Sequence, residues 1–194
     1  MAQAPGEPMA TPREKDAKTA EFTALFEAHL AYVWTTLRRL GVHERDLEDV
    51  AHETFLKVYA ELDRFDRTRP AKPWLFAFAL RKASDYRKLA RHKTALFGDD
   101  EPGEATSEND EADARREREA LVHEALSALD MEKRAVLVLA DLDEQSMPDI
   151  AAALGIPLNT GYSRLRTARQ ELATAIRRKL ARRDAPPAPH GGLP

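Results

Sequence analysis

One stretch near the end of the chain carries the side-chain types that hydrogen-bond DNA. After Pro157 the spacing predicts a long helix with one apolar stripe, formed by Leu158, Leu165, Leu172 and Ile176. The opposite side carries amide, hydroxyl and guanidinium groups, namely Asn159, Thr160, Ser163, Arg166, Thr167 and Gln170, with Arg164 and Arg169 on its flanks. Such groups bond to base edges and phosphates. The pattern favours DNA binding over the alternative, a solvated outer face on an ordinary pair of packed helices.

The segment that must position these groups has the form of a helix-turn-helix. Ser146 is a good N-cap for a first helix, and Asp149 stands three residues later, close to a capping-box arrangement. Gly155 can take the left-handed conformation that ends this helix, and Pro157 presets the backbone for the next one. A helix-turn-helix places its second helix in the major groove, with its N-terminal residues nearest the bases. We therefore expect the helix after Pro157 to read duplex DNA.

The composition excludes several classes of protein. The 194 residues are 43% hydrophobic and 32% charged, with few aromatic residues, which predicts a helical protein of one or two domains. There is no cysteine, so disulfides, thiolate nucleophiles and cysteine-based zinc sites are excluded. No apolar run approaches the roughly 20 residues of a membrane span, and the N-terminus lacks the pattern of a signal peptide. We expect a cytoplasmic protein, and its net charge of −3 argues against generic polyanion binding.

Breaks in the helical pattern predict an all-α fold class with two small helical domains joined by an acidic flexible linker. Residues 19–94 form the first domain and residues 114–183 the second. The linker, residues 95–113, includes a run from Asp99 to Asp113 with eight acids and no base. Residues 1–18 and 184–194 are predicted to be disordered tails. The linker permits the two domains either to pack together or to stay apart.

The helix predicted for residues 44–62 has a face that could meet another protein. Its core stripe contains Leu47, Ala51, Thr54, Phe55, Val58 and Leu62. The opposite face carries Asp49, His52, Glu53 and Leu56. An outward leucine among acidic and polar groups suggests a docking surface. The alternative is a solvated surface with one stray leucine, which is common, and the pattern alone favours it.

A basic loop and the helix after it have features of single-strand binding. Residues 64–73 hold two prolines and four bases, namely Arg64, Arg67, Arg69 and Lys72. The helix predicted for residues 74–91 aligns Trp74 with Arg81, Asp85 and Lys88. Bases stack on aromatic rings while cations meet the backbone, and each stack contributes roughly 1–3 kcal/mol. For Trp74 itself, an ordinary core position is at least as well supported.

Three segments, in this order, resemble bacterial sigma factors of the sigma-70 family, in the compact extracytoplasmic-function (ECF) class. The family's polymerase-binding segment resembles DLEDVAHETFLKVY, residues 46–59. Its promoter-melting and −10 recognition segment resembles PWLFAFALRKASDYRKLAR, residues 73–91. Its −35 recognition domain resembles residues 116–169, from REREALVHEALSALD to GYSRLRTAR. The resemblance covers nearly everything from Glu21 to Leu180, with an acidic linker in the expected place.

The resemblance implies a non-enzymatic factor that binds core RNA polymerase and selects promoters. Docking on the clamp helices of the β′ subunit would use Asp49, His52, Glu53 and Leu56. Opening and binding of the −10 element would use Arg64, Arg67, Arg69, Lys72, Trp74, Arg81, Lys82, Asp85 and Lys88. Reading of the −35 duplex would use Asn159, Thr160, Tyr162, Ser163, Arg164, Arg166 and Arg169. The second domain would also touch the flap of the β subunit. The resemblance further implies an anti-sigma factor as partner, and no cofactor, metal or catalytic residue.

Four positions depart from the family's usual pattern. His52 stands where glutamine is usual, and Lys82 where asparagine is usual. Gly161 and Tyr162 replace a β-branched and a basic residue in the recognition helix. Glycine inside a helix costs about 1 kcal/mol relative to alanine. These departures put the preferred −35 sequence in doubt more than the function.

Two other classes of function are alternatives. A helix-turn-helix regulator that acts without polymerase would need a ligand-binding or dimerisation domain, and the first half offers no obvious apolar ligand cavity. An enzyme is disfavoured because His43-Glu44 and His52-Glu53 each begin like a zinc motif but lack the second histidine at the required position.

Overall fold

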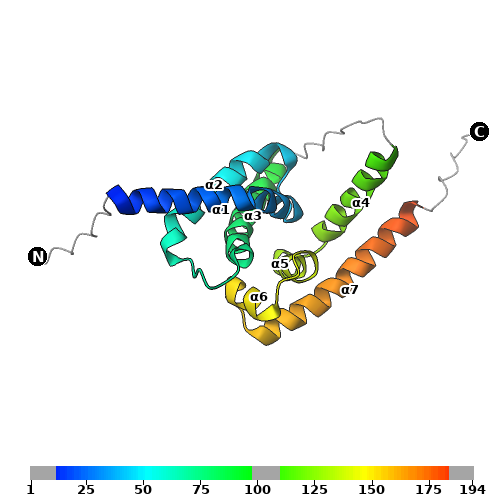
Figure 1. Ribbon diagram of the computed structural model, residues 1–194. Coiled ribbons are helices and arrows are strands. Elements are labelled where there is room, and N and C mark those ends of the chain that lie inside the picture. The colour runs from blue at the N-terminus through cyan, green and yellow to red at the C-terminus, as the bar shows by residue number, and fades with distance from the viewer. Residues whose placement is uncertain (1–11, 98–109, 184–194) are drawn as a thin grey trace, which may run out of the picture.

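Figure 1 shows the computed structural model of the protein, which describes residues 12–97 and 110–183. Every regular element in these two ranges is helical, which confirms the all-α fold class. Residues 1–11, 98–109 and 184–194 lie outside the described residues, and with them most of the predicted acidic linker and the C-terminal tail. None of the described helices combines the length and the apolarity that a bilayer crossing needs.

Three long helices build the first half of the chain (Figure 1). These are α1 (Pro12–Arg39), α2 (Leu47–Glu61) and α3 (Ala71–Phe97), with the short 3-10 turns η1 (Glu44–Asp46) and η2 (Leu62–Arg64) on either side of α2. All three pack on one another. Their shared core contains Val33, Leu37, Leu47, Phe55, Val58, Leu75, Phe76 and Ala79. The apolar spacings that predicted the second and third helices therefore mark their buried faces.

The start of α1 at Pro12 corrects the prediction of a disordered tail through residue 18. The segment has no apolar face, which is why its composition predicts disorder. Proline suits the first turn of a helix, and the arginine, glutamate, lysine and alanine residues that follow are strong helix formers. Ion pairs of Lys18 with Asp63 and of Glu21 with Arg67 also tie α1 to the segment after α2.

Four helices and one π-helical turn build the second half. These are α4 (Asp110–Ser127), α5 (Met131–Leu137), α6 (Met147–Leu154) and α7 (Leu158–Arg183), and the π turn η3 (Val138–Leu142) follows α5 directly. The long helix α7 packs along α4, α5 and α6 (Figure 1). Two predicted boundaries are wrong, since α3 continues to Phe97 and α4 begins at Asp110, inside the predicted linker.

The predicted helix-turn-helix is present as α6 and α7. The Ser146 hydroxyl accepts a hydrogen bond from the Asp149 backbone N–H at 3.3 Å, and Gly155 ends α6 in the left-handed conformation, with φ 64° and ψ 37°. One packing prediction is wrong, because Leu158 is 44% exposed rather than part of the buried stripe. The buried residue in the first turn of α7 is Gly161 instead.

Gly161 lets α6 and α7 approach each other closely. A Cβ atom at this position would lie 2.6 Å from the Sδ atom of Met147 in α6, which is itself buried. The glycine that departs from the family pattern therefore has a packing role, since a larger residue would require the Met147 side chain to shift.

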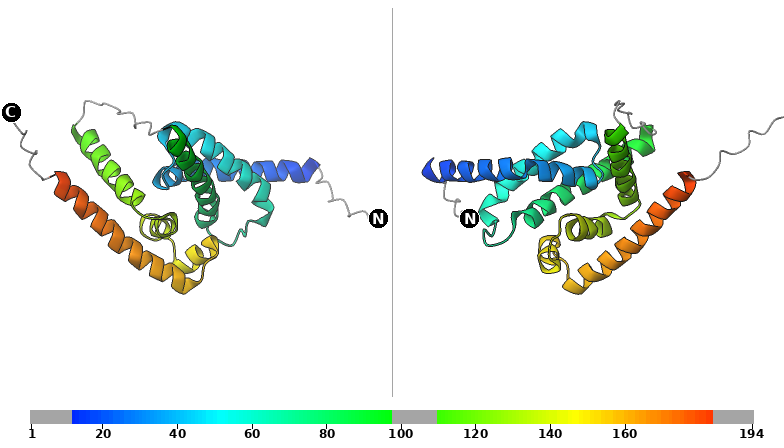
Figure 2. Two further views of the ribbon diagram at one scale, coloured as in Figure 1. Left: turned by 180° about the vertical axis from the view of Figure 1, so that it is seen from behind. Right: turned by 45° about the vertical axis from the view of Figure 1, so that its right-hand side comes forward.

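The two halves of the chain pack against each other. Contact runs mainly between α3 and α6, and also between α1 and α4 (Figure 2). One cluster of buried hydrophobic residues extends through both halves. Of the two arrangements that the linker permits, the structure has the packed one.

Gly161→Ala tests the close crossing of α6 and α7. The new methyl group gains about 1 kcal/mol of helix propensity but overpacks Met147, which typically costs 1–3 kcal/mol. We expect a net loss of stability in urea unfolding. In a Met147→Ala background the clash is absent, so the same Gly161→Ala change should become stabilising by about 1 kcal/mol. An equal effect in both backgrounds would contradict the packing role.

Candidate nucleic-acid interface

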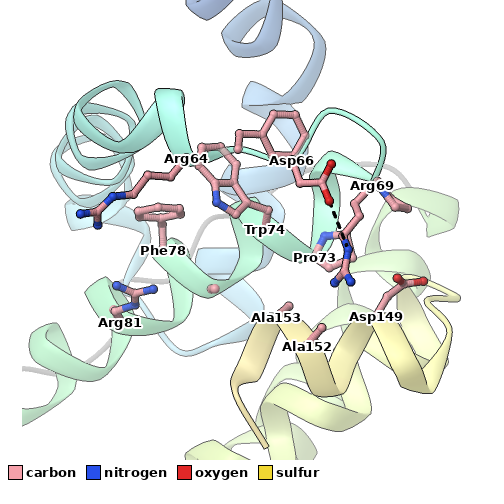
Figure 3. A pocket seen from close by; sticks show the side chains of 13 residues that line it. Arg64, Asp66, Arg69, Pro73, Trp74, Phe78, Arg81, Asp149, Ala152 and Ala153 are labelled. Atoms are coloured by element: carbon pink, nitrogen blue, oxygen red, sulfur yellow. Dashed lines mark ion pairs between the residues drawn. The ribbon is translucent and has the colours of Figure 1, made fainter.

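A pocket of about 290 Å³ lies where the loop after η2 meets α3 and α6 (Figure 3). The first half of the chain contributes Arg64, Phe65, Asp66, Arg69, Pro70, Pro73, Trp74, Ala77, Phe78 and Arg81. From the second half, α6 adds Asp149, Ala152 and Ala153. The lining therefore combines aromatic rings with arginine side chains, which are the two kinds of group that bind a single nucleic-acid strand.

Trp74 is the centre of the aromatic part of this pocket. Its ring centroid lies 4.7 Å from that of Phe65 and 4.9 Å from that of Phe78, which it meets edge-on. The Arg81 guanidinium lies over the Phe78 ring, 5.2 Å from its centroid. Trp74 is half-buried against the core and also lines the pocket, so both interpretations of this residue hold in part.

Sequence reasoning missed Phe65 and Phe78. The signal for Phe78 was present, because Trp74, Phe78 and Arg81 stand at i, i+4 and i+7 and so share one helical stripe. Phe65 lies in the irregular segment after η2, where no periodicity marks which side chains turn inward.

The loop arginines are held by nearby carboxylates. Arg64 bonds to Glu61 at 2.8 Å, and Arg69 lies 3.5 Å from Asp66, whose pKa is lowered by hydrogen bonds from Thr68. Arg64, Arg69 and Asp66 are more than half exposed, and Glu61 is 38% exposed. Exposed pairs of this kind contribute little to stability, so a phosphate can replace the carboxylate at low cost.

Two of the predicted −10 residues point away from the pocket, toward α1. Arg67 makes two 2.8 Å hydrogen bonds to the Glu21 carboxylate, and this partner raises the pKa of the guanidinium. The Lys72 ammonium lies 5.5 Å from the ring centroid of Tyr32. The structure therefore does not bring Arg67 and Lys72 together with Trp74.

Three more predicted −10 residues lie along α3 outside the pocket. Lys82 extends toward α2 and bonds to Glu53 at 2.6 Å. Asp85 and Lys88 are exposed and lie 3.6 Å from each other. Of the nine predicted residues, the pocket lining contains four: Arg64, Arg69, Trp74 and Arg81.

The predicted docking face of α2 is exposed as a unit. Asp49, His52, Glu53 and Leu56 all face outward, and Leu56 is 57% exposed. The opposite side of α2 is buried, as predicted. The Glu53–Lys82 ion pair, which the sequence did not reveal, connects this face to α3.

The predicted reading face of α7 is also largely free of the core. Asn159, Tyr162, Ser163, Arg166 and Arg169 are exposed, and Thr160 and Arg164 are partly so. Tyr162 is 55% exposed and stands beside Ser163, whose hydroxyl donates to the Thr160 carbonyl at 3.0 Å. Among the described residues, Arg166 makes no ion pair that would compete with DNA.

Two arginines of α7 are held by carboxylates of the same half. Arg164 pairs with Glu132 of α5. Arg169 donates two hydrogen bonds to Asp141, at 2.6 and 2.9 Å, and this bidentate pair raises its pKa. These pairs fix the guanidinium groups on the flanks of the reading face.

Models of two protein families match the chain, one in each half. The family model of Sigma-70 region 2 matches residues 25–92, and that of Sigma-70, region 4 matches residues 119–172. The first match contains the aromatic and arginine side chains of the pocket and the α2 face, and the second contains the helix-turn-helix. This chain belongs to the ECF group of the sigma-70 family. Sigma factors are transcription initiation factors rather than enzymes, and they bind core RNA polymerase and promoter DNA.

Curated relatives support the same family. "RNA polymerase sigma factor NccH" of Alcaligenes xylosoxydans xylosoxydans is 32% identical over 80% of this chain and 86% of its own length. "ECF RNA polymerase sigma factor SigL" of Mycobacterium tuberculosis is 33% identical over 82% of this chain and 91% of its own length. The match to region 2 over the first half argues against a regulator that acts without polymerase.

Solved structures agree with the fold. The sigma factor CnrH in complex with the cytosolic domain of CnrY aligns with a TM-score of 0.61 and 29% identity, over 86% of this chain and 91% of that one. RpoE in complex with the anti-sigma factor NepR from Bartonella quintana has a TM-score of 0.60 at 23% identity, over 81% and 97% of the two chains, and supports the fold alone.

Glu53→Lys should abolish binding of this sigma factor to core polymerase and leave the fold intact, because the Glu53 side chain is 61% exposed. Binding is measured by co-elution or fluorescence anisotropy with core enzyme, and folding by circular dichroism. The matched control is the charge swap Glu53→Lys with Lys82→Glu, which restores an intramolecular ion pair. If the swap restores polymerase binding, Glu53 acts through Lys82 rather than by direct contact.

Arg166→Ala should weaken −35-dependent binding by roughly 1–3 kcal/mol if the guanidinium reads a base edge. Arg177→Ala, an exposed change farther along α7, is the control. Affinities are compared on the native −35 sequence and on variants with single base changes. An equal loss on every sequence would assign Arg166 to phosphate contact instead.

Proposed function

We propose that this sigma factor divides promoter recognition between two surfaces, with the aromatic pocket taking the unpaired −10 strand and α7 reading the −35 duplex. The observation that carries the proposal is the pocket itself, in which Trp74 and Phe78 lie beside Arg81. Opening a duplex costs a few kcal/mol per unstacked base, and stacking in such a pocket offsets it.

We further propose that α2 docks on the β′ clamp helices of core polymerase through Asp49, His52, Glu53 and Leu56. The second half would touch the β flap while α7 lies in the major groove. Support for the α2 face comes from its exposure beside a fully buried opposite side. The protein would act in the cytoplasm, where core polymerase and promoter DNA meet.

An anti-sigma factor is the proposed regulator. Two solved sigma factors with this fold, CnrH and RpoE, are recorded in complex with CnrY and NepR respectively. An inhibitor of that kind would need to cover either the α2 face or the strand-binding pocket.

In-vitro transcription with core polymerase of the source organism tests the proposal. The template carries the region upstream of this protein's own gene. Discrete initiation that depends on the added protein supports the proposal and maps the −10 and −35 elements. Duplex binding without core binding or initiation would contradict it.

Arg81→Ala tests the pocket. Because Arg81 is exposed and stands over Phe78, its removal should weaken binding of the −10 single strand and leave the fold unchanged. The slope of log affinity against log salt should fall in size by about 0.7, the value for one phosphate contact on a single strand. Lys88→Ala, on the same helix but outside the pocket, is the matched control. Equal losses in the two variants would place the strand along α3 rather than in the pocket.

A further inference from the structure

Two residues of the loop after α2 form ion pairs with α1, and they flank the part of the loop that lines the aromatic pocket. Arg64, Phe65 and Asp66 line the pocket (Figure 3). Asp63 stands directly before them and pairs with α1, and Arg67 stands directly after them and also pairs with α1. The pocket-lining part of the loop is therefore held at both ends by one helix.

Arg67 joins α1 to the backbone of the loop. Its Nε and Nη2 atoms each donate to one oxygen of the Glu21 carboxylate at 2.8 Å, which is the bidentate geometry of a strong ion pair. Its Nη1 atom donates to the backbone carbonyl of Phe65 at 3.1 Å. The ring of Phe65 lies in turn 4.7 Å from that of Trp74, measured between centroids. One guanidinium thus connects α1 to the residue that stacks on Trp74.

The part of α1 that carries these ion pairs is itself fixed on α2. The Phe22 ring meets the Tyr59 ring edge-on, with 5.1 Å between centroids. Lys18, which pairs with Asp63, also has its ammonium 5.3 Å from the centroid of the Tyr59 ring. This turn of α1 is therefore a firm support for the loop.

We propose that Arg67 is a positioning residue for −10 recognition, which clips the loop to Glu21 and holds Phe65 at the pocket before DNA is bound. The resemblance to the family implied a DNA contact for Arg67, and the clip gives it a different role. This role rests on the proposed function of the pocket. A loop that is ordered in advance costs less conformational entropy on binding, so a larger fraction of the protein is competent to take the strand.

The clip lies at the edge of the family match and at the surface of the protein. Lys18 and Glu21 both precede residue 25, where the match to Sigma-70 region 2 begins. The Arg67 side chain is 55% exposed and that of Glu21 is 38% exposed. Exposed pairs contribute little to global stability, so loss of the clip should loosen the loop and leave the fold intact.

The first test measures the loop in the full-length protein without DNA. The chain contains two tryptophans, so Trp34→Phe leaves Trp74 as the reporter. Adding Arg67→Gln should shift the Trp74 emission to the red and increase its quenching by acrylamide, because Phe65 is no longer held beside the ring. Circular dichroism checks the fold. A role in phosphate contact alone predicts no change in the free protein, and that result would overturn the proposal.

Glu21→Gln separates positioning from electrostatics by the sign of its effect. It removes a negative charge and frees Arg67 to meet a phosphate, so a direct DNA contact of Arg67 predicts tighter strand binding. The clip predicts the opposite, a loss of about three- to fivefold. The probe is a fluorescent oligonucleotide with the non-template −10 strand mapped by in-vitro transcription. Glu27→Gln removes the same charge from an exposed position on α1 and is the matched control. Binding by Glu21→Gln that equals or exceeds that of the control would overturn the proposal.

Salt dependence and a double-mutant cycle complete the test. Arg67→Gln should weaken strand binding by a similar factor with an unchanged slope of log affinity against log salt, whereas loss of a phosphate contact would reduce the slope by about 0.7. Since both side chains form one clip, Glu21→Gln with Arg67→Gln should lose no more than either single change. A reduced slope or additive losses would overturn the proposal.

Failure of the pocket and failure of the clip give different results. If the wild-type protein neither binds the strand nor initiates transcription, the proposed function of the pocket fails, and the positioning role fails with it even where the Trp74 emission responds to Arg67→Gln. If the wild type binds the strand and Glu21→Gln binds it equally well, the function of the pocket stands and only the clip is refuted.

Discussion

The insertion of Arg134 into the end of α1 fixes how the two halves of the protein meet. Its guanidinium donates to the carbonyl of Leu40 and to that of Leu129 in its own half, and its Nε has no partner among the described residues. Carbonyls at the end of a helix lack intrahelical donors and carry partial negative charge, which suits a cation. Gly41 makes room, because it has φ +95° and a Cβ there would lie 2.9 Å from Arg134 Nη1. Contacts of α6 with α3 complete the interface between the halves, and α6 lines the pocket.

Much of the fold follows from apolar spacing. The buried faces of α2 and α3, the Ser146 cap and the Gly155 turn are all local signals, and each is where the sequence predicts it. The failures have two physical causes. The exposure of Leu158 and the packing roles of Gly41 and Gly161 depend on contacts between elements, which periodicity does not contain. The early start of α1 has no apolar stripe to mark it and follows from helix propensity and two ion pairs.

The exposed helix faces of the candidate site could also be predicted from the sequence, but the composition of the pocket could not. Exposure of the α2 and α7 faces follows from helical projection, because the opposite stripes are apolar. The sequence could not reveal which cations lie around Trp74. The partner of a long side chain depends on which residues are near it in the folded protein. Arg67, for example, stands in the same loop as Arg69 but bonds to Glu21 on α1. Nor could it reveal that α6 completes the pocket, since the two segments lie far apart in the chain.

The protein has a net charge of −3, yet it belongs to a family that binds negatively charged DNA. Its internal ion pairs explain how both can hold. Arginines on both proposed DNA surfaces are held by carboxylates: Arg64 by Glu61, Arg69 by Asp66 and Arg169 by Asp141. The pairs of Arg64 and Arg69 contribute at most about 1 kcal/mol each, so exchange of their carboxylates for a phosphate is nearly neutral in the protein. The bidentate pair of Arg169 with Asp141 is stronger and holds its guanidinium more firmly. The gain on binding then comes from release of counterions from DNA. Three arginines of the proposed DNA surfaces are therefore paired before the protein meets a promoter, whereas Arg81 and Arg166 make no ion pair within the described residues. Selectivity then depends on the bases that the pocket and α7 contact.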